Sequence, residues 1–186
     1  GAAIGSWGVG TNLITSKDHP AFGGVYKLAA IKDGDTFIPR IKLSENQWKI
    51  TNPGNKTIYR VYDKTSGKIH ADLICLADES FDENEPLLLF DPVNTWKKLI
   101  LEPGTYTMRE MLVPIFKGGT CVYNSPDVMD IRKYCAKEQD TLWDETKRFV
   151  NPHNVYVDLS EKLWNIKNEL LASYSSSSAH RRDINA

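Results

Sequence analysis

The sequence has little cysteine, no long apolar run and no excess of charge of either sign. Its three cysteines, Cys75, Cys121 and Cys135, form no zinc-knuckle or redox pair, which fits a reducing cytoplasm. No stretch approaches the roughly 18 apolar residues that span a bilayer, and the N-terminus lacks the pattern of a signal peptide. A formal net charge of −1 rules out a polyanion-binding field over the whole surface. We therefore expect a globular cytoplasmic chain with no nucleic-acid partner and no membrane partner.

Recognisable metal sites and catalytic sets are also missing. None of the four histidines has a second metal ligand at a convincing spacing, and no Ser-His-Asp set or cysteine nucleophile can be assembled. The acidic stretch 78–85 is interpreted as a solvated loop rather than as a cation site. The sequence thus predicts no metal site and no catalytic residue in this segment.

The chain begins in an unusual way for a domain. Gly1, Ala2 and Ala3 provide no methionine, helix cap or polar lead-in, and they stand close to a glycine-rich loop. We expect that the chain starts partway through a domain, although a tag scar would also leave such residues.

Alternation of apolar and polar residues predicts two β-hairpins, with a turn-rich, ordered loop at 44–56 between them. The hairpin strands are 24–32 with 36–43, and 57–63 with 68–77. Shorter strands are expected at 87–90, 96–101, 105–113 and 114–123. Residues 23–123 should therefore form mainly antiparallel sheet.

Helical spacing replaces this alternation beyond residue 124. Ser125 is expected to cap a helix that ends at Asn151-Pro152. The residues that would share its apolar face are Val128, Ile131, Cys135, Leu142, Thr146 and Phe149. Asp158 and Glu161 predict the start of a second helix, which carries apolar residues as far as Tyr174. The serine-rich residues 175–186 are expected to form a flexible tail.

A glycine-rich stretch near the N-terminus is a candidate phosphate site. Around Gly8, Gly10 and Thr11, glycine allows close approach and positive φ, while backbone amides and the threonine hydroxyl supply donors. The same residues would also suit an ordinary tight turn after a strand. So short a motif does not decide between the two.

Lysines mark the first hairpin and the loop that follows it. Lys27 and Lys42, on the two predicted strands, could bind pyrophosphate as point charges or could simply be solvated. Lys49 and Lys56 flank a Pro-Gly pair and have the same two interpretations.

Taken in order, several segments resemble the C-terminal part of the bacterial nicotinate phosphoribosyltransferases. The resemblance covers roughly residues 5–171 and depends on the order and spacing of the segments rather than on one motif. The segments are Trp7 to Thr15, Val25 to Leu28, Ile41 to Asn46, Lys49 to Lys56, Phe90 to Val93, Leu142 to Arg148, Asn151-Pro152 and Val157 to Ser160.

The resemblance implies a role in NAD biosynthesis. In this family, nicotinate and phosphoribosyl pyrophosphate give nicotinate mononucleotide and pyrophosphate, with ATP hydrolysis coupled through a phosphohistidine and with magnesium on the pyrophosphate. The full-length enzyme would use Mg²⁺ and ATP, whereas this segment alone would bind neither. The protein must anchor the 5-phosphate, neutralise the leaving group and position the ring nitrogen, because oxocarbenium character develops as pyrophosphate leaves.

The resemblance assigns the 5-phosphate to the amides around Gly8, Gly10 and Thr11, at the C-terminal end of a late barrel strand. It also implies that Lys27 and Lys42 reach the pyrophosphate across a homodimer.

The loop that contains Lys49, Thr51 and Lys56 looks distinctive of the bacterial branch and would cover the phosphates. The family's phosphorylated histidine and the residues that grip ribose and nicotinate lie upstream. The N-terminal portion of the same enzyme is thus a required partner, and we expect the fragment alone to be inactive.

These observations predict an α+β fold. Residues 1–22 would be the end of a type II phosphoribosyltransferase α/β barrel, residues 23–123 the mainly antiparallel sheet, residues 124–174 two C-terminal helices and residues 175–186 the tail. Two alternatives stay open: a nicotinamide-specific enzyme of the same fold, and a non-catalytic interaction module derived from it.

Overall fold

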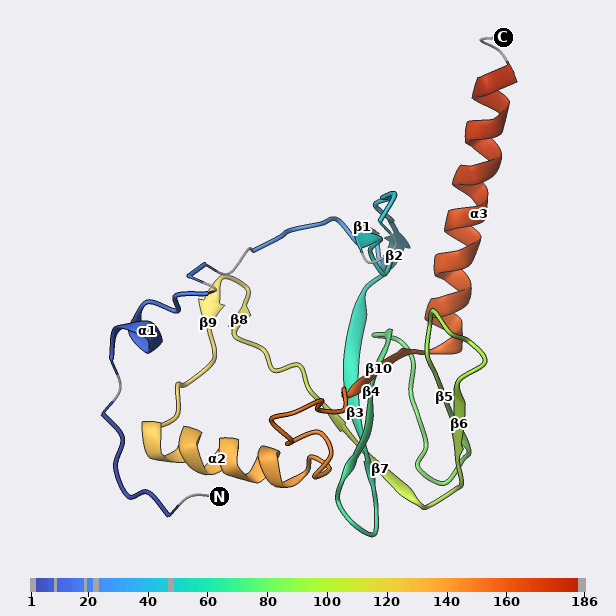
Figure 1. Ribbon diagram of the computed structural model, residues 1–186. Coiled ribbons are helices and arrows are strands. Elements are labelled where there is room, and N and C mark those ends of the chain that lie inside the picture. Colours follow the sequence, from blue (N-terminus) through green and yellow to red (C-terminus); the bar gives the residue numbers. More distant parts are fainter. Residues whose placement is uncertain (1–2, 9, 19, 22–23, 47–48, 184–186) are drawn as a thin grey trace.

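The computed structural model describes residues 3–8, 10–18, 20–21, 24–46 and 49–183, without the side chains of Leu13 and of residues 175–183. A four-stranded sheet with the order β10-β4-β3-β7 organises this chain (Figure 1). Its strands are β3 (Lys56–Asp63), β4 (Ile69–Leu76), β7 (Tyr106–Glu110) and β10 (Tyr156–Leu159). β3 pairs antiparallel with β4 and β7, whereas β10 lies parallel to β4.

The β3–β4 hairpin confirms the second predicted hairpin. Alternate residues of β4 are buried, as expected for a strand with one face on the core: Ile69, Ala71, Leu73 and Cys75. The turn uses Gly67 at φ 67°, a left-handed conformation that glycine adopts without strain. The Asp63 carboxylate accepts hydrogen bonds from the amides of Thr65 and Ser66, at 3.1 and 2.6 Å, and fixes the turn.

The main core lies between this sheet and the hairpin formed by β5 (Leu87–Phe90) and β6 (Lys98–Leu101). Its buried members are Val61, Ala71, Leu73, Leu87, Leu89, Leu101 and Tyr106. Each fully buried leucine contributes about 2 kcal/mol of transfer free energy. The Tyr106 hydroxyl lies 2.9 Å from the carbonyl oxygens of Asp82 and Glu85, so the phenol is buried with its polar group satisfied.

A smaller core joins the sheet to the helix α3 (Glu161–Asp183), which extends well beyond the sheet (Figure 1). Leu163 is fully buried there with Leu76 and Leu159. The Ser160 hydroxyl accepts a hydrogen bond from the Leu163 amide at 3.2 Å, which is the contact of an N-cap residue. No helix in the described part of the chain is long and apolar enough to cross a bilayer.

One prediction about this end of the chain was wrong. Asp158, expected to cap α3, belongs to β10, because pairing with β4 extends the backbone up to Leu159 and moves the cap to Ser160. The backbone of residues 175–183, part of the predicted flexible tail, continues the helix to Asp183, and the flexibility of this segment stays a prediction.

The other long helix, α2 (Val128–Asp140), differs from its prediction in start, end and burial. Its N-cap is Asp127 instead of Ser125, since the Asp127 carboxylate accepts a hydrogen bond from the Met129 amide at 2.8 Å. Thr141 caps the C-terminus, so the expected apolar face beyond residue 141 does not form. None of the residues of α2 is buried.

The N-terminal part holds α1 (Thr11–Ile14) and a short hairpin of β1 (Ala30–Asp33) and β2 (Thr36–Pro39). A further hairpin, β8 (Phe116–Lys117) with β9 (Thr120–Cys121), precedes α2. The first hairpin is thus shorter than predicted. The expected mainly antiparallel sheet with two long helices is confirmed in these coarse terms.

Candidate functional site

The predicted phosphate residues lie on an exposed stretch. Gly8 and Gly10 are exposed, and neither adopts the left-handed φ that the sequence prediction invoked. No described atom would lie within 4 Å of a Cβ added at either glycine. Thr11 starts α1, and its carbonyl oxygen accepts hydrogen bonds at 2.8 Å from both the amide and the hydroxyl of Thr15. The described surroundings therefore leave this backbone accessible to a ligand.

Lys27 and Lys42 do not lie on the strands of the first hairpin, contrary to the prediction. Lys27 precedes β1, and Lys42 follows β2. Both contact the next loop instead: the Lys27 ammonium donates to the carbonyl oxygen of Lys49 at 3.3 Å, and the Lys42 amide donates to the Thr51 hydroxyl at 2.9 Å. The structure therefore gathers four of the predicted residues, with the Lys42 ammonium exposed to solvent.

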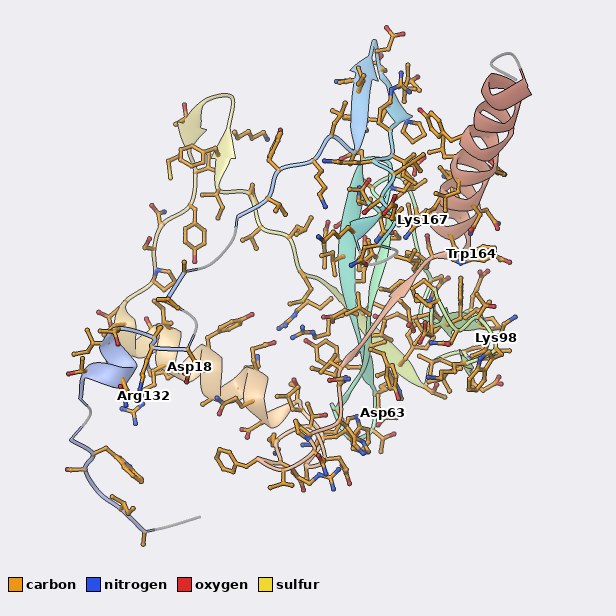
Figure 2. The ribbon with its side chains drawn as sticks, turned by 45° about the horizontal axis from the view of Figure 1, so that its top comes forward. Asp18, Asp63, Lys98, Arg132, Trp164 and Lys167 are labelled. Carbon is orange, nitrogen blue, oxygen red and sulfur yellow. The ribbon has the colours of Figure 1, made fainter. Side chains whose placement is uncertain are left out.

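The loop that follows is docked on the sheet and on α3. The Lys56 ammonium donates to the carbonyl oxygen of Gly54 at 2.6 Å, and the Lys167 ammonium donates to the Asn52 side-chain oxygen at 2.7 Å (Lys167 is labelled in Figure 2). Burial lowers the pKa of both lysines. In this conformation these two ammonium groups position the loop.

Glycine is required within this loop. Gly54 has φ 90°, and a Cβ there would lie 2.6 Å from Cδ2 of Leu76. The Gly54 amide also donates to the carbonyl oxygen of Ala29 at 2.7 Å, which links the loop to the start of β1. This close packing fixes the position of Lys56 relative to the first hairpin.

The structure does not bring the two predicted groups together. Figures 1 and 2 both show α1, which follows the candidate phosphate loop, far from β1 and β2, beside which the lysines lie. The prediction assigned Lys27 and Lys42 to a neighbouring subunit, so it does not require proximity within one chain.

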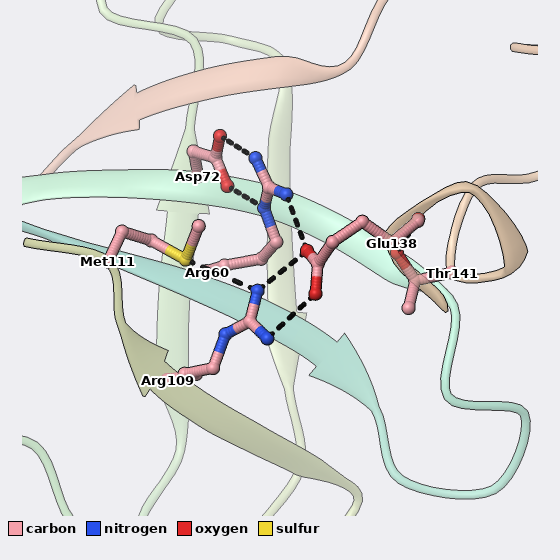
Figure 3. Close-up of polar contacts among 6 residues, drawn as sticks. All are labelled: Arg60, Asp72, Arg109, Met111, Glu138 and Thr141. Atoms are coloured by element: carbon pink, nitrogen blue, oxygen red, sulfur yellow. Dashed lines mark hydrogen bonds and ion pairs between the residues drawn. The ribbon is translucent and has the colours of Figure 1, made fainter. Parts of the chain in front are cut away.

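A network of charged side chains that the sequence analysis missed connects α2 to the sheet (Figure 3). Arg60 on β3 forms a two-point ion pair with Asp72 on β4, with distances of 2.7 and 2.8 Å. Arg109 on β7 forms a similar pair with Glu138 on α2, at 2.8 and 2.7 Å, and Arg60 also approaches Glu138 at 3.4 Å. The strand register places Arg60 opposite both Asp72 and Arg109.

This network is structural in character. Hydrogen bonding to Arg109 lowers the pKa of Glu138, and hydrogen bonding to Asp72 raises that of Arg60. Each charge has an oppositely charged partner, which leaves no group poised as a general acid or base near pH 7. Among the described residues, no three His, Cys, Asp or Glu side chains are grouped so as to hold a metal ion.

Comparison with known proteins decides the family. Residues 55–167, more than half of the chain, match the family model described as nicotinate phosphoribosyltransferase C-terminal domain. The chain belongs to this family. The resemblance found in the sequence is thereby confirmed.

Related proteins of this family align over most of the chain. This chain is 39% identical over 168 residues to the nicotinate phosphoribosyltransferase of Bacillus subtilis (strain 168). The alignment covers 90% of this chain and 34% of the relative. It is 32% identical over 163 residues to the Caenorhabditis elegans protein of that name, covering 87% of the chain and 28% of the relative. The chain thus spans about a third of their length.

A solved structure supports the fold. The crystal structure of human nicotinic acid phosphoribosyltransferase superposes with a TM-score of 0.56 at 22% identity, over 72% of this chain and 25% of that one. The family match runs from the residue before β3 into α3. Of the predicted site residues, only Lys56 lies inside it.

Proposed function

We propose that this chain is the C-terminal part of a cytoplasmic nicotinate phosphoribosyltransferase. The complete enzyme would convert nicotinate and phosphoribosyl pyrophosphate into nicotinate mononucleotide and pyrophosphate, with ATP hydrolysis, in NAD biosynthesis. The observation that carries the proposal is the family match over residues 55–167, supported by relatives of the same name that align with about nine-tenths of the chain.

In this proposal the N-terminal residues of the chain bind phosphate. The amides around Gly8, Gly10 and Thr11 would hold the 5-phosphate at the end of the barrel, because they are exposed and no described side chain covers them. Holding this group fixes the ribose while the bond to pyrophosphate breaks.

The lysines would act on the leaving group. Lys27 and Lys42 would neutralise pyrophosphate in the active site of a homodimer partner, and Lys49 and Thr51 would belong to the covering loop. Their contacts support this assignment, since the Lys27–Lys49 and Lys42–Thr51 hydrogen bonds keep both lysines beside the loop. Lys56 would hold the loop in place through its contact with Gly54.

We place magnesium on the substrate pyrophosphate and assign ATP to the N-terminal portion of the enzyme. This chain would contribute phosphate donors and charge, and the missing portion would contribute the groups that hold ribose and nicotinate.

The test is formation of nicotinate mononucleotide from nicotinate, phosphoribosyl pyrophosphate, Mg²⁺ and ATP. It is run with this chain alone, with the chain mixed with its upstream polypeptide, and with nicotinamide in place of nicotinate. We expect product from nicotinate in the mixture only. A preference for nicotinamide would indicate the amide-specific enzyme, and no product from two folded, associated parts would indicate a non-catalytic module.

The lysine assignment has its own test in the complete enzyme. Replacing Lys27 and Lys42 together by alanine should raise the KM for phosphoribosyl pyrophosphate at least tenfold, a loss of about 1.4 kcal/mol of binding, because two charges on the leaving group are removed. Folding should change little, since the Lys42 side chain is exposed and Lys27 makes one long hydrogen bond. Unchanged kinetics would contradict the assignment.

A further inference from the structure

A cavity of about 270 Å³ opens at the edge of the main sheet, where β10 meets the β5–β6 hairpin. Its apolar walls include Leu89, Phe90 and Leu99. A carboxylate on β10, Asp158, also lines it. A pocket with apolar walls and few polar groups is the usual form of a small-molecule site, because the walls exclude water from the polar contacts.

Asp158 is a largely buried acidic residue whose carboxylate has no partner among the described residues. Only 6% of the residue is exposed, and its carboxylate has no hydrogen bond or ion pair with any described residue. Burial, together with the negative charge of Asp91, raises its pKa to about 6, so it is mostly ionised at pH 7. Among the described side chains, Tyr62 Oη is the fully buried polar atom without a partner, so the Asp158 oxygens keep some accessible surface, and Asp158 lines the cavity.

The neighbouring carboxylate is already satisfied. Asp91 accepts hydrogen bonds from the amides of Val93 and Asn94, both at 2.8 Å, and from the Asn94 side chain at 3.1 Å. It adds negative charge to the cavity but does not need a further donor. Asp158 is therefore the group to which an incoming donor would bind.

The outer part of the cavity has the opposite charge. Lys97 and Lys98 line it from β6 and the residue before it, and both side chains are exposed (Lys98 is labelled in Figure 2). Lys97 lies over the Trp96 ring at 5.3 Å, and neither ammonium makes a side-chain hydrogen bond or an ion pair with a described residue. His70 also lines the cavity, but burial lowers its pKa, so it is neutral at pH 7.

We propose that this cavity binds a small zwitterion whose ammonium group contacts Asp158 and whose carboxylate or phosphate group contacts Lys97 and Lys98, with a short apolar chain between them. An ammonium group supplies a donor that no described residue gives to Asp158, beside apolar walls that reduce the screening of the pair by water. A simple cation would meet two lysines at the entrance, and a simple anion would meet two carboxylates inside.

The walls also suit the middle of such a ligand. An apolar chain gains transfer free energy against Leu89, Phe90 and Leu99 without needing hydrogen bonds. A second cavity of about 460 Å³ shares His70, Leu99 and Tyr156 with the first, so a larger substituent has room to extend beside it. None of these residues takes part in the phosphate assignments above, so the two proposals can fail separately.

The test uses three probes of equal chain length: 6-aminohexanoate, hexanoate, which lacks the ammonium, and 1-aminohexane, which lacks the carboxylate. Each is titrated into the full 186-residue chain at pH 7.5 and followed by amide chemical shifts of β6 and β10. We expect 6-aminohexanoate to bind at least tenfold more tightly than either single-charge probe, with shifts at Asp158 and Lys98.

Three variants complete the experiment. Asp158→Asn should weaken 6-aminohexanoate binding at least tenfold, and Lys97→Ala with Lys98→Ala, on exposed side chains, should weaken it severalfold without affecting folding. Asp35→Asn, in the exposed β1–β2 turn, is the matched control and should bind as the parent does. Equal binding by the parent and Asp158→Asn would overturn the proposal, as would equal binding of hexanoate.

The titration is repeated on the complete protein from the natural reading frame. Retained binding there supports a free small ligand as the occupant. Loss of binding there would mean that another part of the protein fills the cavity, and would refute the small-ligand proposal.

Discussion

The charge on Asp158 should reduce the stability of the fold by an amount that depends on pH. The folded-state pKa of about 6 lies above the ordinary value of 3.8, so folding favours the protonated carboxyl. The side chain therefore costs little below about pH 4, and its cost grows between about pH 4 and pH 6 and levels off above pH 6. At pH 8 the full shift corresponds to about 3 kcal/mol, and at pH 5 to about 1.5 kcal/mol.

Replacing Asp158 by asparagine removes this cost while preserving shape. We expect the variant to exceed the parent in free energy of unfolding by about 3 kcal/mol at pH 8 and by about half of that at pH 5. Urea unfolding at half-unit steps from pH 5 to pH 8, followed by tryptophan fluorescence, measures the difference. The Asp35→Asn variant controls for the loss of one surface charge.

Two outcomes would refute this reasoning. A difference that does not change with pH would show that packing, and not ionisation, distinguishes the variants. A variant that is less stable than the parent at pH 8 would show that the Asp158 carboxylate makes a favourable contact in the folded state.

Three further predictions concern the ion-pair network and the docked loop. Glu138→Gln should lower the stability of α2 by about 1 to 2 kcal/mol, because half-buried ion pairs are lost; faster hydrogen exchange confined to α2 checks this, and uniform loss of protection would contradict it. Gly54→Ala should destabilise more than Gly104→Ala in urea, since both have positive φ but only the first Cβ meets a side chain, and equal effects would refute the steric argument. Lys167→Met should free the loop at Asn52, seen as faster exchange of loop amides with little change in α3; unchanged loop exchange would show that the hydrogen bond does not hold it.

The β3–β4 hairpin was predicted well because the residues that determine it are close together in the sequence. Alternation marks β3 and β4, and Gly67 supplies the left-handed residue between them. The first hairpin was predicted too long because, beyond one further backbone hydrogen bond from Arg40 to Ala29, Lys27 and Lys42 contact the following loop instead of each other.

The features missed by the sequence analysis all depend on distant pairing. β10 is four residues long, and the residues of β4 with which it pairs lie more than eighty positions earlier. Because no local pattern marks this strand, Asp158 was predicted to be a helix cap. The Lys167–Asn52 hydrogen bond joins residues 115 positions apart. The Arg60–Asp72 pair was accessible in principle, because the register of the predicted hairpin places the two residues opposite each other.

The late position of β10 in the chain affects how the protein must be made. β3, β4 and β7 all precede β10 in the chain and can pair while the polypeptide is still being synthesised. The outer edge of β4 stays unpaired until residues 156–159 leave the ribosome, and an open strand edge invites pairing with other nascent chains. A stop codon before residue 156 should thus yield an aggregating product, whereas one after α3 has begun should not.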